Sequence, residues 1–312
     1  MDVPDQISAI SVQEEFEPFL ELTPELVQKR RSQGRIIFDR FIRNRAAIAG
    51  VLFLALLVLF CFLGPLVTGH NQPDVIHPAD AQVPPSLHYP LGTDELGRDQ
   101  LARAMTGGQL SLLVGISSML VGVLFGVTVG AFAGFYGGII DNLLMRVTDI
   151  MLSVPLYLLL FVLSLAFSDG SPRFVILLLA VFSWTNVSRL VRGEFLALKE
   201  REFVLASRTI GAGNFRLMFR HILPNAVGPI TVSATLIVGI NIITESVLSF
   251  FGFGLQPPTA SWGNMVANGQ ELYDQAPWMV LAPALLIFLT VLSCNLVGDG
   301  LRDALDPHMT ER

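Results

Sequence analysis

Ionisable and nucleophilic side chains offer few catalytic arrangements in this sequence. There is no Gly-x4-Gly-Lys-Ser/Thr phosphate loop, and the two lysines, Lys29 and Lys199, do not follow a glycine. The chain also lacks a Ser/His/Asp set or a pair of carboxylates at a spacing typical of a catalytic site. We therefore predict that the chain is not an enzyme and that it cannot hydrolyse ATP by itself.

The histidines and cysteines do not suggest a metal or redox site. His70, His77 and His88 share one polar stretch but lack the spacing of zinc ligands, so we interpret them as ordinary loop residues. Cys61 and Cys294 both lie inside long apolar runs, which argues against a disulfide framework or a cysteine-based zinc site. The sequence predicts that no metal or cofactor is bound by this chain.

Glu245 is the most unusual ionisable residue, because it ends a long uncharged run and precedes another apolar segment. A carboxylate at such a depth usually faces a cavity or a partner group. Two interpretations stay open, a structural anchor and a residue of a transport pathway. The candidate pathway residues around it are Asn241, Glu245, Ser249, Phe250 and Phe253.

A polar segment at 193–224 has the pattern of two short helices. Residues 194–210 have helical composition, the glycines of Gly211-Ala-Gly213 interrupt it, and Asn214 is placed to cap a second helix that we expect to end before Pro224. Such a pair could lie on the bilayer surface as a connector or dock a soluble partner. Its small residues favour close approach: Ala206, Ser207, Gly211, Ala212 and Gly213.

The composition shows what must position these residues. Of the 312 residues 52% are apolar and only 15% charged, whereas soluble domains carry about 25% charged residues. A membrane-spanning helix needs about 20 apolar residues. The sequence thus predicts an all-α polytopic membrane protein with six transmembrane helices, at Ala46–Val67, Leu110–Phe135, Ile150–Phe167, Phe174–Ser188, Ala226–Thr244 and Ala276–Gly298.

Basic residues set the expected orientation. With six crossings, every Lys and Arg except Arg98, Arg103 and Arg173 falls on one side, which the positive-inside rule makes the cytoplasm. Both termini are then cytoplasmic. The predicted organisation is a cytoplasmic tail at 1–45, a first transmembrane helix at 46–67, an extracytoplasmic loop at 68–109, a transmembrane core at 110–300 with the inner loop 193–224, and a cytoplasmic tail at 301–312.

Two local patterns carry further expectations. The outer loop is rich in proline and should have little regular structure, with glycine turns in Leu91–Asp99. Asp141, Arg146 and Asp149 are interpreted as a salt-bridge group near the membrane surface. A stripe of small residues should let another helix approach closely, more plausibly within this chain than between subunits: Ser118, Gly122, Gly126, Gly130 and Gly134.

Several segments resemble one transporter family. The segments 92–99, 136–141, 202–211, 220–225, 248–264 and 298–306 are similar to permease subunits of ABC importers, in particular to the C-type subunit of the dipeptide and oligopeptide branch. The resemblance covers roughly residues 36–307. It departs from the general importer signature at Leu205, Ser207 and His221, where Glu, Ala and Ile are usual, but keeps Ala206, Gly211 and Leu223.

The resemblance implies a type I ABC importer permease architecture, half of a translocation pore in the bacterial inner membrane. It also implies a second homologous permease subunit, two ATP-binding cassette subunits that hold ATP and magnesium, an extracytoplasmic solute-binding protein, and no nucleic acid. The inner loop would dock on an ATPase subunit through Glu202, Ala206, Ser207, Arg208, Gly211, Ala212 and Gly213.

The resemblance leaves the substrate open among dipeptides, longer peptides, nickel chelates, opines and oligosaccharides. Two rival interpretations remain at this stage. One is a secondary transporter that uses Glu245 as an ion or proton site, and the other is a membrane scaffold without transport activity. We see no convincing inverted repeat, which the secondary transporter would favour.

Overall fold

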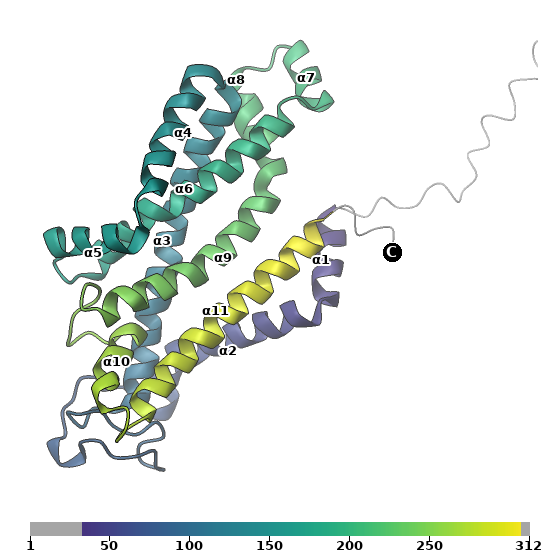
Figure 1. Ribbon diagram of the computed structural model, residues 1–312. Helices are drawn as coiled ribbons and strands as arrows, with labels where there is room; N and C mark the ends of the chain where they lie inside the picture. The colour runs from purple at the N-terminus through teal and green to yellow at the C-terminus, as the bar shows by residue number, and fades with distance from the viewer. Residues whose placement is uncertain (1–32, 307–312) are drawn as a thin grey trace, which may run out of the picture.

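A computed structural model describes residues 33–306, and in this part of the chain all regular elements are helical apart from one isolated bridge, between Thr93 and Asp99. Within residues 33–306, five helices or helical runs are long and apolar enough to cross a membrane, and Figure 1 shows them packed along one another. They are α2 (Arg45–Thr68), α3 (Gln100–Tyr136), α6 (Pro172–Leu198), the run from α8 to α9 (Asn214–Phe250) and α11 (Trp278–Leu305).

The shorter elements connect or flank these helices. The α-helices among them are α1 (Gln33–Arg43), α4 (Gly138–Ser153), α5 (Leu156–Phe167), α7 (Glu202–Thr209), α8 (Asn214–Arg216) and α10 (Trp262–Gly269), and α9 proper covers Leu223–Phe250. Two 3-10 turns, η3 (Pro78–Asp80) and η5 (Gln270–Leu272), and one π-helical segment, η4 (Leu217–Ile222), complete the set.

The predicted third span, Ile150–Phe167, is not one straight helix. It falls across the end of α4 and the whole of α5, which meet at an angle of 86°. Val154, just before Pro155, has the extended conformation (φ −91°, ψ 134°), which a residue preceding proline prefers to the helical one. The count of six crossings is reached when this bent pair is taken as one span.

Several helices also extend beyond the predicted apolar runs. α3 begins at Gln100 rather than Leu110, and α6 continues from Ser188 to Leu198. The charged residues in that extension pair with α4: Arg192 Nε donates to Asp141 Oδ1 at 2.5 Å, and Arg189 Nη2 to Asp149 Oδ1 at 2.5 Å. Charged residues show where a helix leaves the lipid, but the helix itself can continue beyond them.

The glycine stripe on α3 lies against α6. A Cβ atom built on Gly122 would be 2.7 Å from Ser183 Cβ, and one built on Gly126 would be 2.7 Å from the Trp184 carbonyl oxygen. Gly130 and Gly134 meet the next turns of α6 in the same way. Only small residues on α3 permit this close backbone approach.

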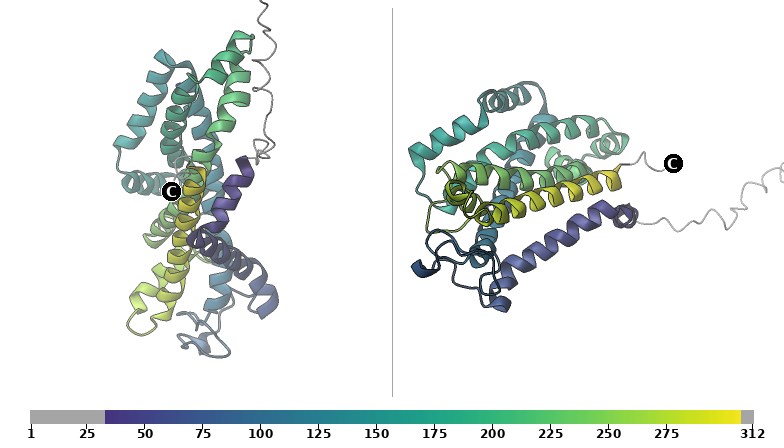
Figure 2. Two further views of the ribbon diagram at one scale, coloured as in Figure 1. Left: turned by 90° about the vertical axis from the view of Figure 1, so that its right-hand side faces the viewer. Right: turned by 60° about the horizontal axis from the view of Figure 1, so that its bottom comes forward.

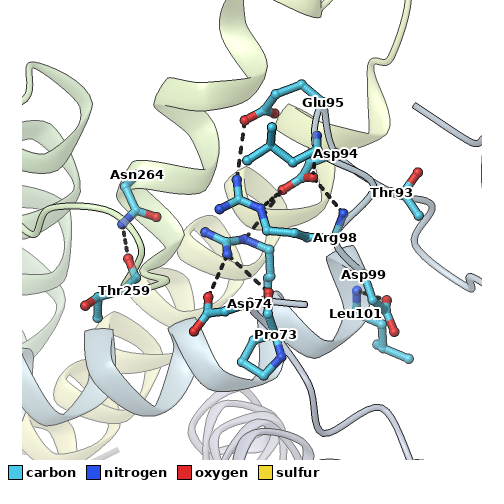
Figure 3. Close-up of polar contacts among 12 residues, drawn as sticks. Pro73, Asp74, Thr93, Asp94, Glu95, Arg98, Asp99, Leu101, Thr259 and Asn264 are labelled. Atoms are coloured by element: carbon cyan, nitrogen blue, oxygen red, sulfur yellow. Dashed lines mark hydrogen bonds and ion pairs between the residues drawn. The ribbon is translucent and has the colours of Figure 1, made fainter. Parts of the chain in front are cut away.

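The outer segment between α2 and α3 contains one 3-10 turn, and ion pairs of two buried arginines, Arg98 and Arg103, hold it in place (Figure 3). Arg98 is 5% exposed, and its Nε donates to Asp94 Oδ2 at 2.6 Å. Arg103, on the first turn of α3, donates to Asp74 Oδ1 at 3.1 Å and to the Pro73 carbonyl at 3.2 Å. The segment is therefore irregular, as expected, yet firmly attached to α3.

The tails are described only in part. The predicted tail 1–45 lies outside the described residues up to 32, and 307–312 of the C-terminal tail does as well. Residues 33–43 form α1, which lies beside the end of α11 in both views of Figure 2. Arg40 Nη1 donates to the Asp306 carbonyl at 2.9 Å, and Asn44 Nδ2 to Asp303 Oδ2 at 3.3 Å.

Candidate coupling and translocation sites

The inner loop joins α6 directly to the α8–α9 run and stands at the end of the molecule opposite the outer segment (Figure 1). Residues 194–198 belong to the end of α6, so the first short helix is only α7, Glu202–Thr209. Glu202 in its first turn and Arg208 in its last complement the helix dipole. The loop is thus one short helix and a turn between two long helices.

The expected end of the second helix before Pro224 is wrong. From Asn214 the chain passes through η4 and continues as α9 to Phe250, and Gly213 rather than Asn214 holds the N-cap position. Proline cannot donate a backbone hydrogen bond, and a π-helical turn changes the register of those bonds just before it. The helix therefore continues past Pro224, and the chain from Asn214 to Phe250 is helical without a break.

The turn after α7 requires the backbone freedom of glycine at one position. Gly211 has φ +88°, and its N–H donates to the Arg208 carbonyl at 3.0 Å. No described heavy atom outside its own chain neighbours lies within 4 Å of a Cβ built on Gly211 or on Gly213, and Gly213 has an ordinary φ of −68°. Backbone conformation, and not crowding within this chain, explains the glycine at 211.

The loop is fixed on one face and open on the other. Val204, Leu217 and Met218 are buried in the cluster that also contains Phe195 of α6. Of the predicted coupling residues, Ser207 and Ala212 are half-buried, and the exposed ones are Glu202, Ala206, Arg208, Gly211 and Gly213. Most of this set thus lies on the exposed face of the loop, and the buried residues attach the other face to α6.

Two apolar residues on this open face were not predicted from the sequence. Ile210 is 86% exposed and Phe215 72% exposed, although both are large and apolar. Phe203, Ala206 and Ile210 are spaced i, i+3 and i+7, which puts them on one helical face opposite Val204. That spacing was the signal from which the exposed position of Ile210 could have been predicted, whereas Phe215 lies outside it. The open face therefore combines small residues with apolar side chains that no other described residue covers.

The predicted pathway residue Asn241 lies in a polar seam between three long helices. Its side-chain nitrogen donates to Ser118 Oγ of α3 at 2.8 Å, and its Oδ1 accepts from Ser183 Oγ of α6 at 3.0 Å. Asn241 and Ser183 also line a cavity of about 330 Å³ at the bend between α4 and α5, together with Asn186 and Thr244. The polar part of this lining is uncharged.

Glu245 is fully buried and does not line that cavity. Ser249 Oγ donates to its Oε1 at 2.7 Å and Ser111 Oγ of α3 to its Oε2 at 3.2 Å. Ser111 Oγ in turn accepts from the Trp262 N–H of α10 at 3.3 Å. Glu245 therefore sits at a junction of α3, α9 and α10, where hydrogen bonds offset the cost of burying a carboxylate.

Two other sets of residues have partners that their spacing in the sequence did not predict. Asp141 and Asp149 pair with arginines of α6, which lie far from them in sequence, rather than with Arg146 on their own helix. His70 pairs with Asp99, the N-cap residue of α3. Among the described residues, no three His, Cys, Asp or Glu side chains gather as a metal site would require.

The described residues form a bundle of apolar helices in which α6 and α9, joined by the exposed inner loop, line one cavity with uncharged polar groups among apolar ones. Residues 126–311 match the family described as "Binding-protein-dependent transport system inner membrane component", and residues 32–85 match the "N-terminal TM domain of oligopeptide transport permease C". The chain belongs to this permease family, whose members are the membrane subunits of ABC importers and not their ATPases.

Individual relatives cover nearly the whole chain. The oligopeptide transport system permease protein OppC of Bacillus subtilis is 39% identical over 86% of this chain and 88% of the relative. The dipeptide transport system permease protein DppC of Alkalihalophilus pseudofirmus is 38% identical over 89% and 91%. The glutathione transport system permease protein GsiD of Pectobacterium atrosepticum is 38% identical over 89% and 92%.

Proposed function

We propose that this chain forms one half of the translocation pore of an ATP-driven importer for peptides or similar small solutes. Its relatives are named for oligopeptides, dipeptides and glutathione, which share peptide bonds and free termini. The observation that carries the proposal is the position of the inner loop, which joins α6 and α9. The same two helices supply Ser183, Asn186 and Asn241 to the cavity.

The remaining machinery comes from partners. A second homologous permease completes the pore, two ATPase subunits bind ATP and magnesium, and an extracytoplasmic binding protein delivers the solute. This chain binds no cofactor of its own. We infer that it lies in a bacterial inner membrane with both termini and the inner loop in the cytoplasm, as the distribution of Lys and Arg supports.

Coupling follows from the continuity of the loop with the helices. An ATPase that holds the open face of α7 and the Gly211 turn moves the ends of α6 and α9 as rigid bodies when nucleotide binds. Because the face consists of small and apolar residues, steric fit dominates over charge. Glu202 and Arg208 add polar contacts at its edge, and Ser207, Ala212 and Gly213 complete the docking surface.

At the other end of α9 the pathway residues act as a gate. Asn241 lines the cavity, whereas Glu245 and Ser249 hold the outer end of α9 against α3 and α10. Phe250 and Phe253 follow at the exit from the helix. Opening the outer side requires these contacts to separate, so the gate and the coupling loop lie at opposite ends of the same helix.

Two substitutions in the loop test the proposal. Ala206→Trp adds a large side chain to the open face, and Gly211→Asp adds one where φ is positive, so both should abolish uptake and loosen the ATPase. Membrane abundance should stay normal, because neither residue lies in a spanning helix. The measurements are co-purification of the ATPase, uptake by the complete transporter and abundance of the chain in membranes.

Gly69→Asp is the matched control, since Gly69 also has a positive φ (+76°) and no described heavy atom near a built Cβ, but it lies after α2 and away from the inner loop. It should retain uptake and ATPase binding. Normal recovery of the ATPase together with normal uptake in both loop variants would show that the loop is only a connector. Proton-driven uptake by vesicles that contain this chain alone would instead support the secondary-transporter alternative.

A further inference from the structure

A second hollow, here called the outer pocket, lies between the α5–α6 connection (168–171) and the α9–α10 connection (251–261). Its volume is about 580 Å³. Figure 1 shows these two connections next to each other on the left of the bundle. Its lining includes Ser164, Ser168, Asp169, Gly170, Phe253 and Gln256.

Packing between the two connections holds the walls of the outer pocket in place. Gly170 has φ +71°, and a Cβ atom built on it would lie 3.1 Å from Gln256 Cγ, so glycine permits the close approach. Phe161 of α5 packs on Phe253, with ring centroids 5.0 Å apart. Ser249, which hydrogen-bonds Glu245, accepts the Leu255 N–H at 3.1 Å. The gate residues therefore also position this pocket.

The lining of the outer pocket is rich in acceptors. The Ser164 hydroxyl is buried and without a hydrogen-bond partner among the described residues, and the residue is only 3% exposed. Asp169 is exposed, and hydrogen bonds from the Ser171 hydroxyl and N–H lower the pKa of its carboxyl, so it is anionic at neutral pH. None of the described residues that line the pocket is Lys, Arg or His, and the exposed Arg173, which lies outside the lining, contributes less than the Ser171 hydrogen bonds to the lowered pKa of Asp169.

A primary ammonium group fits this chemistry, because it carries one positive charge and three donors. Asp169 supplies the opposite charge, and the Ser164 hydroxyl supplies an acceptor that lacks a donor. The outer pocket also lies near the cavity of about 330 Å³ that Asn241 lines. Leu160 of α5 lines that cavity, and Ser164 is one helical turn beyond Leu160. A group held in the outer pocket would thus stand at the outer end of the pathway.

We propose that the outer pocket binds the α-ammonium group of a peptide as the peptide enters the permease. The inference rests on the proposed function and adds a feature of the substrate, a free amino terminus, that this chain itself recognises. An acetylated amino terminus is neutral and keeps one N–H donor instead of three, so peptides blocked in this way should not occupy the pocket.

The test uses the complete transporter in vesicles and the variant Ser168→Cys, whose introduced thiol is exposed in the pocket, whereas Cys61 and Cys294 are buried. A positively charged methanethiosulfonate reagent should label this thiol faster than a negatively charged one. Trialanine should slow the labelling, and N-acetyl-trialanine should not. Adding Asp169→Asn should remove the protection and the charge preference, whereas Asp274→Asn, an exposed acid elsewhere on the outer side, should change neither.

Uptake provides the second measurement. Asp169→Asn should lower uptake of trialanine by about tenfold at subsaturating concentration, as expected for a lost hydrogen bond to a charged group. Equal protection by both peptides, or no protection while the parent transporter takes up trialanine normally, would overturn this inference and leave the proposed function intact. A second result would also overturn the inference: loss, in the Asp169→Asn variant, of the ATPase stimulation that the binding protein causes without peptide. The pocket would then bind a lysine of that protein instead of the peptide.

Discussion

At the scale of single residues, Glu245 shows how far sequence can lead. Its isolation between apolar segments predicts a special environment, and the structure places it fully buried at the junction of three helices. The identity of its partner Ser111 could not be predicted, because that residue is 134 positions away and serine is common in membrane helices. A local pattern identifies a group that needs partners, and the tertiary packing supplies them.

Glu245→Gln separates the charge of this residue from its size. The amide keeps one acceptor oxygen but brings an NH2 group to a position where a serine hydroxyl now donates. Mispairing of a buried polar group costs about 1–3 kcal/mol. We expect normal assembly with the ATPase and uptake reduced by roughly tenfold. Uptake and co-purification are measured on the same membranes.

Glu271→Gln is the matched control, because Glu271 is exposed and undergoes the same chemical change. It should leave uptake unchanged. If Glu245→Gln also transports and assembles normally, the carboxylate has only a structural role that the amide fulfils equally well, and the gate proposal for this residue is wrong.

At the scale of elements, hydropathy predicted where helices cross the membrane better than how they end or bend. The apolar run at 150–167 contains Pro155, yet its composition alone does not distinguish a kinked span from the 86° bend that the structure shows. The α6 extension is missed for a different reason. In the sequence, Arg189 and Arg192 have the pattern of charged loop residues. Their ion-pair partners on α4 become evident only in the structure.

The α3–α6 contact supports a prediction about packing. Gly130 faces the Ser188 carbonyl and Val191 of α6, and a Cβ there would lie 2.8 Å from Val191 Cβ. Gly130→Ala should therefore destabilise the chain by about 1–3 kcal/mol through overpacking. The measurement is the midpoint of thermal unfolding in detergent, which should fall.

Gly193→Ala gives the comparison within the same pair of helices. Gly193 lies in α6, and no described heavy atom outside its own helix backbone and neighbours is within 4 Å of its built Cβ. Alanine is favoured over glycine in a helix by about 0.5–1 kcal/mol, so this variant should unfold at the same or a higher temperature. A similar decrease in both variants would mean that the stripe is not a packing surface.

At the scale of the whole molecule, the charge pattern and the structure support one topology by separate arguments. The basic residues that the structure describes collect at the end of the bundle that carries the inner loop, except for three that lie towards the other end. Two of these exceptions, Arg98 and Arg103, are buried in ion pairs with the outer segment. Because acidic residues of the same fold pair with Arg98 and Arg103, these two charges do not oppose the predicted membrane orientation.

Cysteine labelling tests this topology and the docking surface together. Leu87 in the outer segment is fully exposed and Ile210 is 86% exposed, while Cys61 and Cys294 are buried and should give little background. An impermeant thiol reagent should label Leu87→Cys from outside intact cells and Ile210→Cys only in inverted vesicles. Because Ile210 lies on the proposed docking face, added ATPase subunits should reduce its labelling severalfold and leave position 87 unchanged. Labelling of Ile210→Cys from outside would reverse the orientation, and labelling that ATPase does not alter would remove Ile210 from the interface.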